Sequence, residues 1–200
     1  RASLDAAAPG YEISESRKVD PTISDDIQKG AVTSLLIALA LIFLYIALRF
    51  RNWQFGLGGV LSLAHDAIIV LGVYSLLYKI MPFSLEIDEA FIAAILTVIG
   101  YSINDTVVVY DRIRENLRKF RSKAEFVPCI NRSINETLSR TINTSTTVLV
   151  VVVIAFFGGA TLRNFALALM LGVVIGTYSS IFVASPIIVE WEARSPKRFK

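Results

Sequence analysis

The chain has 200 residues, of which 54% are hydrophobic, and its mean hydropathy is +0.58. A soluble domain uses roughly 45 to 50% apolar residues, so this composition excludes an ordinary soluble globular domain and indicates a membrane protein. The net charge of +3 would fit a nucleic-acid binder, but the basic residues stand between apolar runs, and the single cysteine, Cys129, excludes an internal disulfide.

Residues 1–29 are polar and contain Pro9, Gly10 and Pro21, which are typical of turns and linkers. We interpret this segment as the end of an external, periplasmic domain or as a linker. It lacks the pattern of a cleavable signal peptide. We therefore expect the chain to be the C-terminal part of a longer protein.

Five apolar runs follow, each near the roughly 20 residues that a helix needs to cross the hydrocarbon core of a membrane. The predicted spans are residues 31–48, 55–78, 90–110, 141–157 and 163–189. Together they form a predicted transmembrane domain over 30–190, followed by a cytoplasmic tail over 191–200. The sequence therefore predicts an all-α membrane protein with five transmembrane helices.

Two carboxyl groups lie inside these spans. Asp66 is near the middle of the second span beside His65, the only histidine, and Asp105 is on the third span. Helical spacing places Tyr101, Ser102 and Asp105 on one polar face. A charge at the centre of a spanning helix costs about 2.5 to 3.5 kcal/mol on insertion scales, so both aspartates are candidate functional residues.

The segment 111–139, between the third and fourth spans, is charged and moderately amphipathic. We predict a cytoplasmic helical hairpin that is broken near Pro128, because proline interrupts a helix. Its apolar residues are expected to turn toward the membrane or the bundle. These are Phe120, Phe126, Val127, Ile130 and Ile134. A solvated connector without a docking role is an equally open interpretation.

Arg140 begins the fourth span, and its helical face continues through the polar residues Asn143, Thr144 and Thr147. A carboxyl group in a medium of low dielectric constant holds its proton more tightly, whereas a nearby guanidinium favours the ionised form. An Asp105 whose distance from Arg140 changes between two conformations would load a proton in one and release it in the other. We therefore predict Asp105 and Arg140 as proton-relay residues, with Asp66 as a weaker candidate.

Each of these residues also has a purely structural interpretation. Asp105 and Arg140 would form a simple salt bridge, or Arg140 would extend its charge to the nearby membrane interface. Asp66 would hold helices together by a hydrogen bond to a neighbouring backbone or hydroxyl group. His65 is better explained as a packed or interfacial residue than as a proton carrier.

The last span carries small residues at every fourth position. They are Ala168, Gly172, Gly176, Ser180 and Ala184. Such a ridge lets the backbone of another helix approach closely, so we predict Gly172, Gly176 and Ser180 as helix-packing residues. The partner helix can belong to this chain or to a second one, and the pattern says nothing about a substrate.

The basic residues predict the orientation of the chain. Fourteen of the 20 Lys and Arg residues fall on one side, in the loops at 49–51 and 111–140 and in the tail after 190. By the positive-inside rule this side is cytoplasmic. We therefore expect the N-terminal segment outside and the C-terminus in the cytoplasm.

Three stretches resemble the signature of the SecF proteins of the SecD/SecF protein-export family. They are GYSINDTVVVYDRIREN at 100–116, NETLSRTINTS at 135–145 and GTYSSIFVASP at 176–186. Their order and separation match as well, and Ala64-His65-Asp66 is similar to the second-span motif of that family. The resemblance runs from about residue 31 to residue 190 and is specific.

The resemblance implies a fold of the resistance-nodulation-division type, in which six SecF spans pair with six from SecD. This chain would hold spans two to six of SecF or of a fused SecDF. By the match, Asp105 corresponds to the intramembrane aspartate of the fourth SecF span and Arg140 to the arginine that opens the fifth. The other key carboxylate of the family belongs to SecD, so this chain alone is expected to conduct no coupled transport.

The function implied by the resemblance is that of a subunit in a protein translocation motor of the bacterial inner membrane. Such a motor uses a gradient of protons, with sodium as the alternative ion, to assist SecA-dependent preprotein export. The implied partners are SecD or the SecD half of the same polypeptide, the SecYEG translocon, a YajC-like small subunit, an unfolded preprotein and membrane lipid. No nucleic acid, cofactor, metal or enzymatic activity is expected.

Two other functions stay open at this point. Half of another resistance-nodulation-division exporter would share the topology, and a subunit that only braces a translocon would need no ion coupling. Intramembrane proteases fit less well. An aspartyl protease expects a Gly-x-Gly-Asp motif, a zinc protease His-Glu-x-x-His and a serine protease Gly-x-Ser-Gly, and the sequence has none of these.

Overall fold

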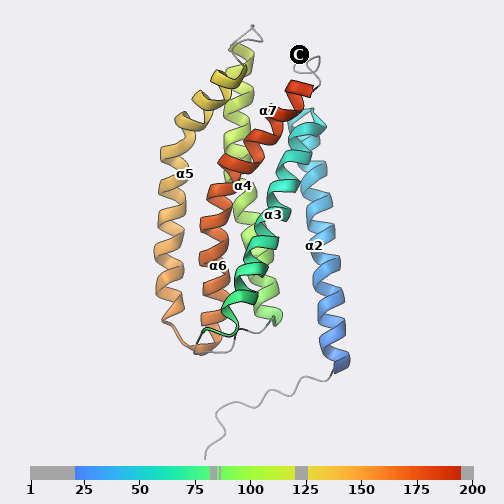
Figure 1. The fold of residues 1–200 in the computed structure, drawn as a ribbon, viewed down its shortest axis with the longest axis vertical. Helices are drawn as coiled ribbons and strands as arrows, with labels where there is room; N and C mark the ends of the chain where they lie inside the picture. Colours follow the sequence, from blue (N-terminus) through green and yellow to red (C-terminus); the bar gives the residue numbers. More distant parts are fainter. Residues whose placement is uncertain (1–20, 82–84, 86, 120–125, 195–200) are drawn as a thin grey trace, which may run out of the picture.

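The helices of this chain run up and down in one bundle (Figure 1). The structure is a computed structural model that describes residues 21–81, 85, 87–119 and 126–194, and these residues contain no strand. Its elements are α2 (Pro21–Phe50), α3 (Trp53–Leu77), α4 (Glu89–Lys119), α5 (Phe126–Phe156), α6 (Ala160–Ser179), the π-helical η2 (Ser180–Ala184) and α7 (Ser185–Arg194). Five helices are long and apolar enough to cross a membrane, which confirms the predicted all-α fold class.

Helix α2 begins at Pro21, before the first apolar run. Proline suits the first turn of a helix, where its missing N–H has no partner to lose. The polar residues 21–29, which the sequence led us to expect in a linker, are therefore helical, while 1–20 lie outside the described residues. Most of α2 has its apolar side chains exposed at the edge of the bundle, for example Leu48 at 70%.

The chain reverses direction between α2 and α3 within two residues. Arg51 takes a left-handed conformation with φ 57°, which ends α2, and α3 begins at Trp53. Below the turn, the rings of Phe50 and Phe55 stack at 5.4 Å, and both meet the ring of Tyr110 edge-on. This aromatic cluster joins α2, α3 and α4 at the upper end in Figure 1, which we call the basic end.

Helices α4 and α5 continue beyond the apolar runs toward the basic end. There Glu136 of α5 accepts hydrogen bonds from Arg112 and Asn116 of α4 and from Arg132 of its own helix. The predicted break at Pro128 is not observed, because proline in the first turn of α5 interrupts no helical hydrogen bond. The connection between the two helices falls at 120–125, outside the described residues.

The last span is not a single α-helix. It widens into the π-helical segment Ser180–Ala184 and resumes as α7. Pro186 explains the change, because it lacks an N–H and its ring would meet the carbonyl group four residues earlier. The wider turn is held by the hydroxyl groups of Ser185, which donates to the Ser180 carbonyl at 3.1 Å, and of Tyr110, which donates to the Ala184 carbonyl at 3.2 Å.

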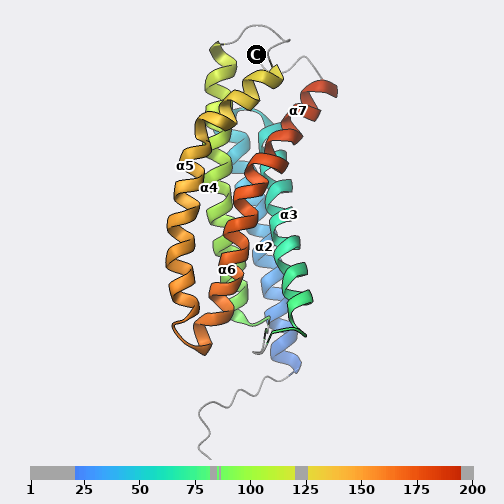
Figure 2. The ribbon, with the colours of Figure 1, turned by 60° about the vertical axis from the view of Figure 1, so that its left-hand side comes forward.

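Helix α4 is covered by α3, α5 and α6, as Figures 1 and 2 show. The contact with α6 is close because two glycines of α6 face α4. A Cβ atom added at Gly172 would lie 2.0 Å from Cγ2 of Val98, and one at Gly176 would lie 2.9 Å from Cβ of Ser102. Gly172 and Gly176 of the last span therefore pack against α4 of the same chain.

Candidate functional site

The middle of α4 places a polar surface inside the bundle. Ser102 and Thr106 are fully buried and Asp105 is 3% exposed. Their spacing of three and four residues puts them on one face of the helix. Thr106 donates to the Ser102 carbonyl at 3.1 Å, so its hydroxyl group is satisfied by its own helix and leaves Ser102 and Asp105 to interact with other elements.

Asp105 has a buried oxygen with no hydrogen bond. Its Oδ2 atom has no partner among the described residues. A buried charge without partners is strongly unfavourable, and a carboxyl group relieves that cost by taking up a proton. The environment of Asp105 therefore suits a group that changes its protonation state.

The side chain of Arg140 on α5 is exposed. Within the described part of the chain, its guanidinium forms no ion pair and no hydrogen bond. The simple salt bridge that the sequence left open is therefore not formed in this conformation.

The rotation of α5 explains this position. The face that continues from Arg140 through Asn143 and Thr147 is exposed, whereas Thr141 and Ser145 point into the bundle. We did not select Thr141 or Ser145 from the sequence. The signal that could have found them is a series of small polar residues at every fourth position of α5, namely Ser133, Thr137, Thr141 and Ser145, all of which are buried.

Asp66 of α3 is fully buried and bound to α4. The Ser102 hydroxyl group donates to Asp66 Oδ2 at 2.6 Å, and Nδ1 of His65 lies 3.2 Å from Oδ1. Ser102 also stands one helical turn from Asp105 on α4. The serine that binds Asp66 is therefore a neighbour of the second carboxyl group along the helix. The sequence identified both aspartates and placed Ser102 on the polar face with Asp105, but it did not predict the hydrogen bond from Ser102 to Asp66.

A second set of hydroxyl groups connects three helices at the same level. Tyr101 of α4 donates to Ser145 Oγ of α5 at 3.2 Å. Ser145 Oγ in turn lies 2.6 Å from Oγ1 of Thr177 on α6, where either hydroxyl group can be the donor. These hydrogen bonds link the polar face of α4 to α6 through Ser145 of α5. Thr177 is the neighbour of Gly176, which packs against Ser102.

We predict that Ser102→Ala lowers the free energy of unfolding by about 1 to 3 kcal/mol, because it removes a buried donor from a carboxyl group. Ser62→Ala is the matched control. Ser62 is equally buried on α3, but its hydroxyl group has no partner among the described residues, so its removal should be neutral or stabilising. Thermal unfolding of the purified protein in detergent measures both. Equal destabilisation by the two variants would contradict the assigned role of Ser102.

The arrangement offers carboxyl and hydroxyl groups but no metal centre. In the part of the chain that the structure describes, no group of three or more His, Cys, Asp or Glu side chains could hold a metal ion. The site consists of two buried carboxyl groups and the hydroxyl groups beside them. The exposed Arg140 supplies a positive charge whose distance from Asp105 depends on how α5 sits against α4.

Comparison with known proteins shows which family the chain matches. The sequence model of the family "Protein export membrane protein SecD/SecF, C-terminal" matches residues 1–194. The protein translocase subunit SecF of Rhodothermus marinus is 55% identical over 188 residues, which are 94% of this chain and 60% of that protein. The protein translocase subunit SecDF of Thermus thermophilus is 48% identical over 180 residues, 90% of this chain and 23% of that protein.

A solved structure also matches. The crystal structure of SecDF from Thermus thermophilus, a translocon-associated membrane protein, superimposes with a TM-score of 0.76 at 48% identity, and the match covers 88% of this chain and 24% of that one. This chain therefore spans 60% of the length of the SecF relative and about a quarter of the SecDF relative. The family match and the fold together establish that the chain belongs to the SecD/SecF family of protein export membrane proteins.

Proposed function

We propose that this chain is the SecF-type membrane part of a protein translocation motor driven by the proton gradient. Its relatives carry the names protein translocase subunit SecF and SecDF, and one is described as translocon-associated. The proposed partners are SecD or a SecD half, the SecYEG channel with SecA, a YajC-like subunit and an emerging preprotein. The proposed location is the bacterial inner membrane, with the basic end in the cytoplasm.

The observation that carries this proposal is the buried, unpartnered Oδ2 atom of Asp105. A protonated Asp105 is neutral and fits the apolar interior of the bundle. When Arg140 approaches, the ionised form becomes favourable, and the proton leaves. A movement of α5 against α4 that changes this distance would couple proton transfer to a change of shape.

Asp66 is the proposed second relay site. Ser102 donates to it in this conformation, and the same hydroxyl group lies one turn from Asp105 on α4. A rotation of the Ser102 side chain would redirect its proton between the two carboxyl groups. The remaining carboxylate of the pathway would come from SecD, so this chain alone is expected to conduct no coupled transport.

The driving force is sufficient for such a motor. One elementary charge that crosses the membrane releases about 2.3 kcal/mol per 100 mV of potential. Two conformations of a protein commonly differ by a few kcal/mol, which is of the same order. Each proton could therefore shift the population of the two arrangements substantially.

The test is the effect of the gradient on preprotein release from vesicles that contain the protein with its SecD partner, SecYEG and SecA. We expect Arg140→Ala to remove most of the gradient-dependent part of release and to spare the ATP-driven part. Arg132→Ala, which removes an arginine of the same helix near the basic end, is the matched control. If Arg140→Ala lowers the rate of preprotein release by the same factor with and without a gradient, the result supports a bracing subunit and contradicts the motor proposal. Sodium replacement in the same assay identifies the ion.

A further inference from the structure

One buried hydroxyl group of α5 differs from its neighbours. Small polar residues recur at every fourth position of this helix, and three of the four donate a hydrogen bond to a carbonyl group of their own helix. They are Ser133 at 2.7 Å, Thr137 at 3.1 Å and Ser145 at 2.8 Å. The fourth is Thr141, which is 1% exposed and whose Oγ1 atom has no partner among the described residues. Because an unpaired buried donor is unfavourable, this hydroxyl group is suited to a partner on another helix.

The register of α4 and α5 places Thr141 level with Asp105. The two helices run antiparallel and contact each other along the bundle (Figure 1). Tyr101 of α4 donates to Ser145 of α5 at 3.2 Å, so these two residues lie at one level. Four residues further along α4 is Asp105, and four residues back along α5 is Thr141. Both helices rise equally per residue, so this second pair also lies at one level.

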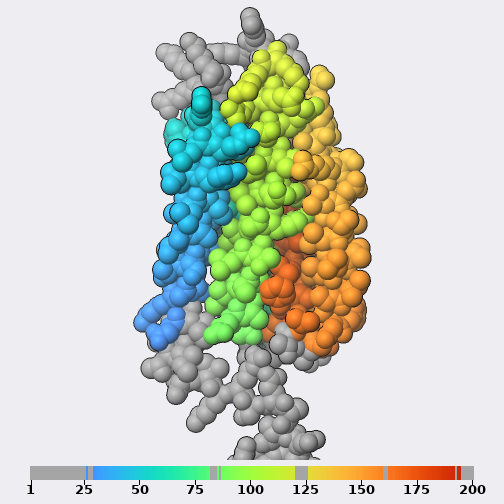
Figure 3. Space-filling view, turned by 180° about the vertical axis from the view of Figure 1, so that it is seen from behind, coloured from blue at the N-terminus to red at the C-terminus, as the bar shows by residue number. Residues whose placement is uncertain are grey.

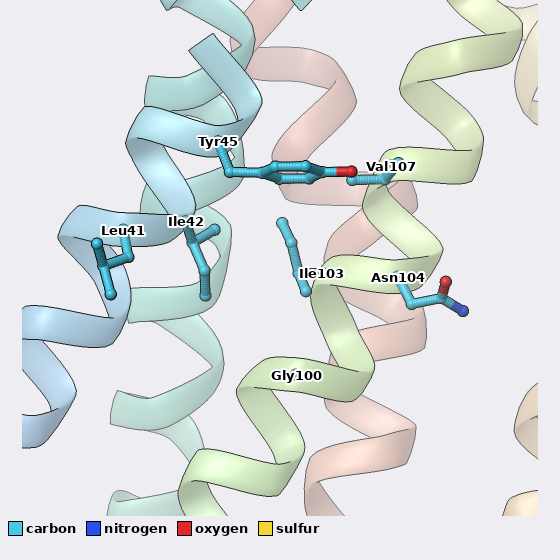
Figure 4. Close-up of a pocket in the computed structure, with 7 residues that line it drawn as sticks. All are labelled: Leu41, Ile42, Tyr45, Gly100, Ile103, Asn104 and Val107. Atoms are coloured by element: carbon cyan, nitrogen blue, oxygen red, sulfur yellow. The ribbon is translucent and has the colours of Figure 1, made fainter. Parts of the chain in front are cut away.

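Asp105 lies on the side of α4 that is turned away from α2. Helices α2 and α5 flank α4 on opposite sides (Figure 3). Ile103 and Val107 of α4 face α2 (Figure 4). Asp105 is two residues from each of them, which is roughly 200° around a helix. Thr141 is one turn from Ser145, which contacts α4, so Asp105 and Thr141 lie on facing sides of the two helices.

The other buried hydroxyl groups near this level do not compete with Thr141. Those on α4 and the last span already donate, to Asp66 or to their own helix. They are Ser102, Thr106, Ser179 and Ser180. Ser62 of α3 also lacks a partner among the described residues, but it is one turn from Asp66 and therefore lies opposite Thr106. Thr141 is thus the donor on the α5 side of Asp105.

Two buried polar atoms without a partner among the described residues lie at one level between α4 and α5, Oγ1 of Thr141 and Oδ2 of Asp105. We propose that Thr141 is a positioning residue for Asp105, and that its hydroxyl group donates a hydrogen bond to the ionised carboxylate when α5 moves toward α4. This role rests on the proposed function, to which it adds the group that holds the carboxylate after its proton has left. In the arrangement described here the two groups are not bonded, which suits the neutral form of Asp105.

A donor is needed because an opposite charge alone does not stabilise a buried carboxylate. An ion pair inside a protein offsets the loss of water only if hydrogen bonds satisfy its remaining lone pairs. Arg140 and Thr141 are consecutive in α5, so one movement of this helix brings a positive charge and a donor toward Asp105 together. Arg140 is exposed whereas Thr141 is buried. The guanidinium therefore approaches from the surface, and the hydroxyl group binds from inside the bundle.

Thr141→Val tests this hydrogen bond, because valine keeps the shape of the side chain and removes the hydroxyl group. We expect the gradient-dependent part of preprotein release to fall about 10-fold, the factor for one hydrogen bond to a charged group, while the ATP-driven part continues. The thermal midpoint in detergent should not fall, since the hydroxyl group has no partner to lose among the described residues. Thr141→Ser restores the donor and should recover most of the response. The assay uses the full protein with its SecD partner, SecYEG and SecA in vesicles.

Thr137→Val is the matched control. Thr137 is buried one turn away on α5, and its hydroxyl group donates to its own helix at 3.1 Å. This variant removes the same atom from the same helix and should keep the response to the gradient. If Thr141→Val fails to accumulate in the membrane, the comparison of Thr141→Ala with Thr141→Ser decides, since only the serine variant keeps the donor.

The infrared carboxylate band of Asp105 gives a direct readout of the bond. It is the band that Asp105→Asn removes from the spectrum of the full protein in vesicles. A hydrogen bond to a carboxylate changes the frequency of this band. We therefore expect the band to shift in Thr141→Val, to stay unchanged in Thr137→Val and to return toward its original position in Thr141→Ser.

Two results would overturn the role of Thr141. An Asp105 band that is identical in Thr141→Val and in the unmodified protein would exclude the hydrogen bond, and the motor proposal would stand if Asp105→Asn still removed the response to the gradient. A fall in release by the same factor with and without a gradient in Thr141→Val would show that Thr141 only supports the fold. If Asp105→Asn kept the full response, the motor proposal would fail, and the infrared band alone would decide whether Thr141 binds Asp105.

Discussion

Asp105→Asn is expected to abolish the gradient-dependent part of preprotein release while the ATP-driven part continues. The asparagine amide has nearly the same size as the carboxyl group but does not bind or release a proton at the near-neutral pH of the assay. Because Asp105 is buried and its Oδ2 atom has no partner, the neutral amide should fit without unfolding the bundle. Release from vesicles with and without an uncoupler measures the effect, and we expect the ratio of the two rates to fall to about one.

The control is Asp111→Asn, which alters an exposed carboxyl group on the same helix. This variant should keep the response to the gradient, because Asp111 is in contact with solvent and pairs with Arg49 outside the polar centre of the bundle. Asp105→Glu keeps a titratable group and should retain part of the response. A full response to the gradient in Asp105→Asn would exclude this residue from the proton pathway.

Gly172→Leu is expected to have the largest effect on stability. A Cβ atom at this position would lie 2.0 Å from Cγ2 and 2.6 Å from Cγ1 of Val98, so even one added carbon forces α6 away from α4. Overpacking of a core costs about 1 to 3 kcal/mol and occasionally more, and here the displaced helix also carries the Gly176 contact with Ser102. We expect the variant to unfold at clearly lower temperature or to fail to accumulate in the membrane.

Gly72→Leu on α3 is the matched control, because a Cβ atom at position 72 would meet nothing within 4 Å. Replacing glycine with a better helix former stabilises a helix by about 1 kcal/mol, so this variant should not lose stability. Gly172→Ala alone should also destabilise the protein, and adding Val98→Ala should recover part of that loss, because alanine lacks the two Cγ atoms that lie 2.0 and 2.6 Å from the added Cβ atom. Similar thermal midpoints for Gly172→Leu and Gly72→Leu would show that the close contact between α4 and α6 is not needed for the fold.

Both predictions concern the same helix pair. Gly172 and Gly176 allow α6 to approach α4, and the approach places Ser102 where it can donate to Asp66. The polar centre of the bundle therefore depends on residues that carry no chemistry of their own. A variant that moves α6 outward should weaken the contact between Ser102 and Asp66 before it disturbs Asp105, whose buried Oδ2 atom has no hydrogen bond to lose among the described residues.

The sequence alone determined the all-α membrane fold, the number of spanning helices and the resemblance to the SecD/SecF family. It could do so because apolar run length is a local property, and a run of about 20 residues in hydrocarbon must satisfy its backbone as a helix. It also singled out Asp66, Asp105 and Arg140, since ionisable groups stand out in an apolar run. The helical start at Pro21 and the continuity of α5 through Pro128 were missed, because proline acts differently at a helix start than inside one.

Only the tertiary structure decided how these residues face one another. The rotation of α5 turns Thr141 and Ser145 inward and Arg140 outward, and the Ser102 hydroxyl group of α4 binds Asp66 of α3, which is 36 residues away in the sequence. In a spanning helix both faces are apolar, so periodicity distinguishes a buried face from a lipid-facing one only weakly. Which face of each helix is buried depends on close packing between helices, above all where Gly172 and Gly176 let α6 approach α4. Such contacts join residues that are far apart in the sequence, so no local sequence pattern predicts them.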